Sequence, residues 1–267
     1  MHTKPVVGKL RQVRRLAKHE ADFLREHTPG PWKITMPTPI RNPAAQKTFP
    51  APYTNWDEIQ RDVIEIFKGE MVNLAKEGVP YLQMDRVPTG YLTPESRERM
   101  KADGIDAEAL WLKEMALENE CYDAARAANP DIILAMHYCR GNRVGFTGGV
   151  GGYDMIAESG FNGLHVDRFL LEFDTERAGG FEPLRHVPKD KTVMLGLVTT
   201  KSDQVETRDY LLRRIEEASK YIPIEQLALG PQCGFQSAAN RDGASMGIEA
   251  EKRKMELIAE VAREVWK

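Results

Sequence analysis

Residues 132–140 read IILAMHYCR, a short apolar run that ends in two side chains able to bind a metal. A short apolar run of this kind is typical of a strand buried in a parallel sheet. Side chains alternate along a strand, so His137 and Cys139 point to one face and Tyr138 to the other. The segment therefore predicts a buried strand that carries two soft metal ligands at its C-terminal end.

Six other short apolar runs are similar to this one, and long charged amphipathic stretches separate them. The runs lie near residues 5–10, 33–37, 80–84, 168–173, 193–199 and 226–230, and the helical stretches near 10–27, 56–78, 95–128, 207–221 and 247–266. Alternation of strands and helices predicts an α/β fold with right-handed crossovers. No internal repeat, low-complexity tract or linker interrupts the pattern. We therefore expect one domain over residues 1–267.

Two further strand ends carry side chains that can bind a metal or do acid–base chemistry. Glu172 and Asp174 end the run at 168–173, and Cys233 follows the run at 226–230. Functional groups at the C-terminal ends of several parallel strands are the hallmark of a (β/α)8 TIM barrel. Seven predicted strands are one short of that barrel, and the chain opens almost directly into an apolar run. The prediction is a TIM barrel that lacks its first strand.

The donor types at these strand ends suit zinc, which binds nitrogen, sulfur and oxygen ligands. His137 and Cys139 would come from one strand, a carboxylate from the next and Cys233 from a later one. Glu172 and Asp174 share a strand face, so spacing alone does not choose between them. The third cysteine, Cys121, lies in a helical stretch and is expected to be a small buried residue.

Composition is that of a soluble enzyme and argues against several other classes. The net charge of −3 offers no electrostatic basis for binding nucleic acid or an anionic membrane. No apolar run reaches the length of a membrane span, and the start of the chain lacks the apolar core of a signal peptide. Three cysteines, an odd number, argue against a disulfide framework and for a reducing compartment. The expected location is the cytoplasm.

The His-x-Cys strand end, the downstream Glu and the Pro-x-Cys-Gly segment resemble the catalytic domain of cobalamin-independent methionine synthase and its short stand-alone relatives. The resemblance covers roughly Pro5 to Trp266. It implies a zinc-dependent S-methyltransferase of methionine biosynthesis. Such an enzyme activates homocysteine as a zinc-thiolate and methylates it from a donor such as 5-methyltetrahydrofolate. The implied partners are therefore a small thiol and a methyl or alkyl donor.

The family's functional residues carry over onto matching positions of this chain. The zinc ligands become His137, Cys139, Glu172 and Cys233, with Glu172 as the ligand that yields to the thiol. Asp85, which ends the run Leu82-Gln83-Met84-Asp85, would hold the amino group of homocysteine. The resemblance thus implies Asp85 and Glu172 as catalytic residues and makes Asp174 a second substrate-binding group.

Three arginines near these strand ends have two possible roles. Arg140, Arg143 and Arg177 could contact an anionic substrate or pair with nearby carboxylates.

The chain departs from the family pattern in two places. Arg86-Val87 follows Asp85 where the family has Glu-Pro, and the first barrel strand is missing, so the domain is expected to be N-terminally incomplete.

Two alternatives stay open: alkyl transfer to another thiol, as in epoxyalkane:coenzyme M transferases, and a non-catalytic zinc-binding scaffold. An open seam between the strand near Val6 and the strand near 227–229 would favour self-association, so a homo-oligomer is possible.

Overall fold

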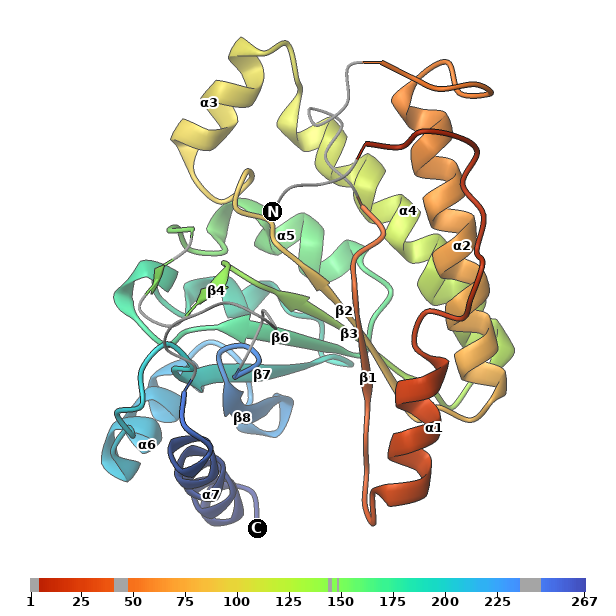
Figure 1. Cartoon of the computed structure of the whole chain (residues 1–267). Coiled ribbons are helices and arrows are strands. Elements are labelled where there is room, and N and C mark those ends of the chain that lie inside the picture. Colours follow the sequence, from red (N-terminus) through yellow and green to blue (C-terminus); the bar gives the residue numbers. More distant parts are fainter. Residues whose placement is uncertain (1–4, 41–47, 144–145, 148, 236–245) are drawn as a thin grey trace. The chain divides into compact units, whose positions relative to one another are not determined.

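The computed structural model describes residues 5–40, 48–143, 146–147, 149–235 and 246–267 (Figure 1). These residues form two compact units whose segments alternate along the chain. The first unit comprises residues 1–85 and 112–134, and the second comprises residues 86–111 and 135–267. The prediction of a single domain stays a prediction.

The first unit contains a pair of parallel strands and three helices. β1 (Ile34–Pro37) pairs with β2 (Tyr81–Arg86), with Ile34 opposite Leu82 and Pro37 opposite Asp85. The helices are α1 (Lys18–His27), α2 (Trp56–Lys76) and, from residue 112 onward, α4 (Ala107–Ala128). Both strands fall where the sequence predicts them.

Helix α2 shows how local sequence sets an element of this unit. Its first turn is capped by Asn55, whose Oδ1 accepts a hydrogen bond of 3.1 Å from the backbone N–H of Glu58. Ile64, Met71 and Leu74 recur at helical spacing and are fully buried, so the apolar face of the helix packs into the core. The helix therefore has both a defined start and a defined inner face.

The prediction of a strand at residues 5–10 is wrong. Val7 is 85% exposed, and the described residues 5–17 form no strand. The part of this segment nearest α1 is held by side chains instead, because buried Glu70 of α2 accepts hydrogen bonds from Gln12, Arg15 and the backbone N–H of Ala17. The predicted helix near 10–27 accordingly begins only at Lys18.

The second unit is built on four parallel strands, paired in the order β3, β6, β7, β8. They are β3 (Ile133–Tyr138), β6 (Arg168–Glu172), β7 (Thr192–Val198) and β8 (Leu227–Pro231). His137 lies opposite Leu170, and Glu172 lies opposite Gly196. The strands are buried almost throughout, which explains their continuous apolar sequences. The C-terminal ends of these parallel strands lie along one edge.

Helices and short elements complete this unit. They are α3 (Pro94–Ala102), α5 (Asp154–Gly163), α6 (Arg208–Ala218), α7 (Ile248–Val265), the hairpin of β4 (Asn142–Arg143) and β5 (Phe146–Thr147), and the 3-10 turns Glu176–Ala178, Glu182–His186 and Ile224–Gln226. Helix α7 packs against β8 and α6. The helical stretch predicted at 95–128 is two helices, since the chain turns at Gly104, whose φ is 76°.

Gly196 allows the ends of β7 and β8 to approach each other closely. A Cβ atom at this position would lie 2.7 Å from Gln232 Cα and 2.7 Å from Leu171 O, both backbone atoms. The pairing is also irregular here, with a register shift between Gly196 and Val198. Because Cys233 follows Gln232 directly, this contact places the segment that carries the cysteine.

Six of the seven predicted strands are confirmed, and the prediction of a parallel α/β fold is confirmed with them. The described residues contain six parallel strands rather than seven. The predicted seam loses its flanking strand near Val6, since that segment is not a strand. Self-association stays a prediction.

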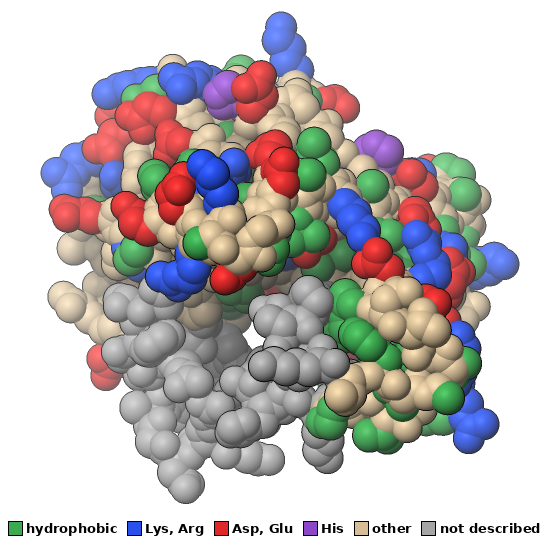
Figure 2. Space-filling model, turned by 90° about the horizontal axis from the view of Figure 1, so that it is seen from above, with side chains coloured by type: hydrophobic (Ala, Val, Ile, Leu, Met, Phe, Trp, Pro, Cys, Tyr) green, Lys and Arg blue, Asp and Glu red, His purple; other side chains and the backbone are tan. Residues whose placement is uncertain are grey.

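The surface carries charges of both signs. Figure 2 shows Lys and Arg side chains interspersed with Asp and Glu over the face drawn there. Among the described helices, none combines the length and the apolar character that crossing a membrane requires.

Candidate metal centre

Four side chains from three strand ends of the second unit meet at one point. His137 lies in β3 and Cys139 directly after it, Glu172 ends β6, and Cys233 follows β8. One ligand atom from each residue lies within 4.8 Å of the other three. The fold thus brings together the four residues that the family resemblance implies as zinc ligands.

The distances between these atoms suit one tetrahedral metal ion. Cys139 Sγ and Cys233 Sγ are 3.7 Å apart, and His137 Nε2 lies 3.8 Å from Glu172 Oε1. Zinc–sulfur bonds of about 2.3 Å in a tetrahedron would place two sulfurs about 3.8 Å apart. The donor set of one nitrogen, two sulfurs and one oxygen also matches zinc chemistry. The residues present therefore fit this metal.

The neighbouring strand orients the imidazole of His137. Its Nδ1 lies 3.0 Å from Leu170 O on β6, and because a carbonyl only accepts, Nδ1 is the donor. This leaves Nε2 with its lone pair on the side of Glu172. A metal-binding histidine commonly has its other nitrogen held in this way, which selects the tautomer and the ring orientation.

The buried carboxylate of Glu172 is held on both oxygens. Oε1 accepts a hydrogen bond of 3.0 Å from the backbone N–H of Arg140, and Oε2 accepts one of 2.7 Å from Arg177 Nη2. The backbone N–H of Glu172 donates to Tyr153 Oη at 2.9 Å, and this hydroxyl donates to Tyr138 O. These contacts compensate the buried negative charge and set the side-chain direction.

The two cysteines of the site interact directly with each other. The hydrogen bond between them, together with burial, raises the pKa of Cys139, whereas the same bond and the nearby His137 lower the pKa of Cys233 to about 4. Cys139 Sγ also accepts a hydrogen bond of 3.3 Å from the N–H of Gly141, whose φ of 87° favours glycine. The lowered pKa of Cys233 favours its thiolate form, which is the form that binds a metal.

The remaining cysteine behaves as the sequence predicts. Cys121 is fully buried in α4, and burial raises its pKa to about 12. Its sulfur lies 3.9 Å from Ile64 O. It is a core residue of the first unit.

Asp174 and Lys201 lie beside the group of four ligands. Asp174 is not a member of that group. The geometry therefore favours Glu172 over Asp174 as the carboxylate ligand, a choice that sequence spacing alone did not make. Arg177 Nη2 lies 3.2 Å from Asp174 Oδ1, and Lys201 Nζ lies 4.0 Å from Asp174 Oδ2. Sequence reasoning missed Lys201, although it follows the C-terminal end of β7 as the ligands follow theirs.

Asp85 and the arginines have different surroundings. Asp85 is the last residue of β2 that pairs with β1, in the first unit. Its carboxylate accepts a hydrogen bond of 2.6 Å from Gln83 Nε2. Its role toward a substrate stays a prediction. Arg140 is fully buried, and its guanidinium lies 4.2 Å above the ring of Tyr153. The side chain of Arg143 lies outside the described residues.

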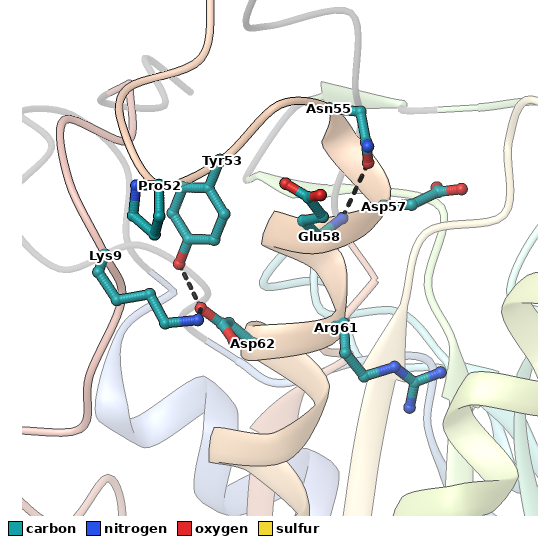
Figure 3. Close-up of a pocket in the computed structure, with 8 residues that line it drawn as sticks. All are labelled: Lys9, Pro52, Tyr53, Asn55, Asp57, Glu58, Arg61 and Asp62. Atoms are coloured by element: carbon teal, nitrogen blue, oxygen red, sulfur yellow. Dashed lines mark hydrogen bonds and ion pairs between the residues drawn. The ribbon is translucent and has the colours of Figure 1, made fainter.

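A surface pocket of about 590 Å³ lies in the first unit and is distinct from the candidate metal centre. Figure 3 shows Tyr53, Lys9 and Asp62 turned toward one another, with Tyr53 Oη donating to Asp62 and Lys9 Nζ 2.5 Å from it. Arg61 pairs with Glu120 in the same unit. Since these charges already have protein partners, the pocket gives no indication of a bound ligand.

Comparison with known proteins relates the chain to one family. A family model described as "Cobalamin-independent synthase, Catalytic domain" matches residues 30–250. The chain is 36% identical over 238 residues to the "Uncharacterized protein YxjG" of Bacillus subtilis (strain 168), covering 88% of this chain and 62% of YxjG. It is 23% identical over 231 residues to a methionine synthase of Pyrococcus abyssi (strain GE5 / Orsay), covering 86% and 58%. The chain thus spans 62% and 58% of the lengths of these two relatives.

A solved structure shows the same fold. The B12-independent methionine synthase from Shewanella sp. W3-18-1, in complex with selenomethionine, superposes with a TM-score of 0.69 at 19% identity, covering 97% of this chain and 69% of that one. This likeness confirms the prediction of a TIM-barrel type of α/β fold.

Proposed function

The chain belongs to the family of cobalamin-independent synthase catalytic domains, and we propose that it is a zinc-dependent S-methyltransferase acting on homocysteine. The methyl donor would be a compound such as 5-methyltetrahydrofolate, and the product methionine. The observation that carries the proposal is the convergence of His137, Cys139, Glu172 and Cys233 within 4.8 Å at three strand ends.

Zinc held by these four residues would lower the pKa of an incoming thiol and keep its sulfur nucleophilic and oriented. A structural zinc site is usually closed, rich in cysteine and held by ligands close together in sequence. Here the ligands come from three strands at the C-terminal edge of a parallel sheet. That position is where enzymes of this fold carry their active sites, which favours the catalytic role over the non-catalytic scaffold.

Glu172 is the ligand best suited to make room for a substrate thiol. A carboxylate oxygen is harder than a thiolate and a poorer match for a borderline-soft metal. Arg177 Nη2 already binds Glu172 Oε2 at 2.7 Å, so the carboxylate keeps a cationic partner if it turns away from the metal position. Cys139 and Cys233 remain as the thiolates that make the site electron-rich.

Alkyl transfer to a different thiol is the second candidate, and one observation favours it. Arg177 and Lys201 place two buried cations next to the candidate ligands. An anionic thiol other than homocysteine, such as coenzyme M with its sulfonate, would also satisfy these charges.

X-ray absorption at the zinc edge tests the proposal and separates the two candidates. The zinc-loaded protein is expected to gain a sulfur ligand when homocysteine is added, and to lose an oxygen or nitrogen ligand. Coenzyme M serves as the comparison thiol. If coenzyme M adds sulfur and homocysteine does not, the second candidate replaces the first. If no thiol changes the zinc environment, the catalytic role is wrong.

A further inference from the structure

Cys233 is the candidate ligand that strand pairing supports least. It lies beyond the end of β8, whose last residue is Pro231. Among the strands that the structure describes, β8 pairs with β7 alone, whereas β6, which ends in Glu172, is paired on both sides. The position of the Cys233 sulfur therefore depends on contacts outside the pairing of the strands.

Gln232, the residue before Cys233, supplies such contacts through its backbone and its side chain. Its backbone N–H donates to Val198 O at 2.8 Å. Its Oε1 accepts a hydrogen bond of 2.9 Å from the backbone N–H of Thr200 and a second one from the Thr200 hydroxyl. Gln232 is 1% exposed and Thr200 is fully buried, so bulk water does not compete for these bonds.

The orientation of the Gln232 amide follows from these partners. A backbone N–H only donates, so the amide atom that faces the N–H of Thr200 is the oxygen. Within the part of the chain that the structure describes, Gln232 Nε2 is buried and has no hydrogen-bond partner. The side chain therefore acts in the fold as an acceptor for Thr200.

Thr200 belongs to a loop that helix α7 holds in place. The backbone N–H of Thr199 donates to Glu206 Oε1 at 2.8 Å, and Lys254 Nζ of α7 donates to Glu206 Oε2 at 2.9 Å. Lys254 is fully buried. Because this ion pair fastens the loop after β7 to the helix, Thr200 offers Gln232 a fixed anchor.

We propose that Gln232 is a positioning residue for the metal centre, and that its hydrogen bonds to Thr200 hold Cys233 Sγ at the distance from Cys139 Sγ that zinc requires. The inference rests on Cys233 being a metal ligand, as the proposed function assumes, but it does not depend on which thiol is the substrate. Removing a residue that orients a metal ligand typically weakens metal binding by about 10- to 100-fold.

A comparison of two buried glutamines tests this role. Gln232→Met removes the hydrogen bonds to Thr200 with little change in side-chain size. The matched control is Gln226→Met, at the opposite end of β8, where Gln226 Nε2 donates to Pro188 O at 2.8 Å and to Lys191 O at 2.7 Å. Each substitution removes two hydrogen bonds of a buried side chain, so both should lower the stability of the metal-free protein.

Zinc affinity should separate the two variants. In competition with a chelator, Gln232→Met is expected to bind zinc about 10- to 100-fold more weakly than the wild type, and Gln226→Met is expected to keep the wild-type affinity. Thr200→Val, which removes the hydroxyl and keeps the backbone N–H, should weaken zinc binding less than Gln232→Met does. Thr200→Ser, which keeps the hydroxyl, should restore most of the affinity.

Cobalt(II) in place of zinc shows whether Cys233 still binds the metal. Absorption from thiolate-to-cobalt charge transfer grows with the number of bound thiolates. Its intensity per bound cobalt is therefore expected to fall in Gln232→Met and to stay unchanged in Gln226→Met. A loss of stability without displacement of the cysteine would not change this spectrum.

The outcomes distinguish the positioning role from the proposed function. If the wild-type protein binds zinc but Gln232→Met and Gln226→Met lose affinity equally, or neither loses any, Gln232 is only structural and the inference is wrong. If the wild-type protein binds zinc and no thiol enters the metal site, the proposed function fails, and the zinc affinities of the variants still decide the role of Gln232. A wild-type protein that binds neither zinc nor cobalt overturns both.

Discussion

The sulfur atoms of Cys139 and Cys233, separated by 94 positions in the chain, lie 3.7 Å apart in the folded protein. This distance is far longer than a disulfide bond, and both cysteines are free. It is close to the edge of a tetrahedron around zinc, about 3.8 Å. The two sulfurs therefore have the spacing that two ligands of one zinc ion would need.

The metal content of cysteine variants tests this arrangement. Cys139→Ser and Cys233→Ser are each expected to lower zinc from about one per chain to a small fraction, since each removes a soft thiolate ligand. Elemental analysis after gel filtration measures the content. Cys121→Ala is the matched control, because this cysteine is buried in α4 away from the ligand group, and it should keep its zinc. Full zinc in both serine variants would contradict the ligand assignment.

Substitution of Gly196 should disturb the site through the backbone. Gly196→Ala places a Cβ atom 2.7 Å from Gln232 Cα and Leu171 O, so we expect a loss of about 1–3 kcal/mol in the free energy of unfolding. Zinc affinity should fall as well, because Cys233 follows Gln232. Gly69→Ala in α2 is the control. It meets no atom within 4 Å and should raise stability by about 0.5–1 kcal/mol. Denaturant unfolding and zinc titration of both variants check the contrast.

The anchoring of residues 12–17 by Glu70 should depend on pH. Burial by itself raises the pKa of Glu70, but the hydrogen bonds from Arg15, Ala17 and Gln12 outweigh it, so the pKa lies below its ordinary value of 4.5. A carboxyl group whose pKa is lower in the folded state stabilises the fold above about pH 4.5. That contribution is lost as the pH falls through the folded-state pKa.

Glu70→Gln should therefore reduce the free energy of unfolding at pH 7 by about 1–3 kcal/mol, with a smaller difference from the wild type below the folded-state pKa. Urea unfolding at several pH values measures this. Glu65→Gln, on the exposed side of the same helix, should change stability little. An equal loss at pH 7 and pH 3 would show that the effect is not electrostatic.

Asp85 provides a test of the family resemblance. Asp85→Asn is expected to weaken homocysteine binding by about tenfold or more, because a neutral amide replaces a carboxylate that would face an ammonium. Calorimetry with the zinc-loaded variant measures the affinity, and Asp57→Asn at the exposed start of α2 is the control. Unchanged affinity for homocysteine would remove Asp85 from the substrate site.

The sequence by itself determined most of the elements and the chemistry at their ends. The first apolar run became β3, which contains His137 and is followed directly by Cys139. The run that ends in Glu172 became β6, and the run before Cys233 became β8. These features are readable because strand burial and side-chain alternation depend on neighbouring residues. The apolar run at residues 5–10 shows where prediction from the sequence fails. Glu70 lies far along the chain, and no local pattern near residues 5–10 indicates that it binds Arg15 and Ala17 in the segment after this run.

Only the tertiary structure decided which side chains meet. Glu172 and Asp174 are equivalent by spacing, but the pairing of β6 with β3 and β7 brings Glu172 to His137 and leaves Asp174 facing Lys201. The close approach at Gly196 likewise sets where Cys233 lies. The physical reason is that strand pairing and backbone packing join residues distant in sequence, and these long-range contacts leave no periodic pattern in the chain.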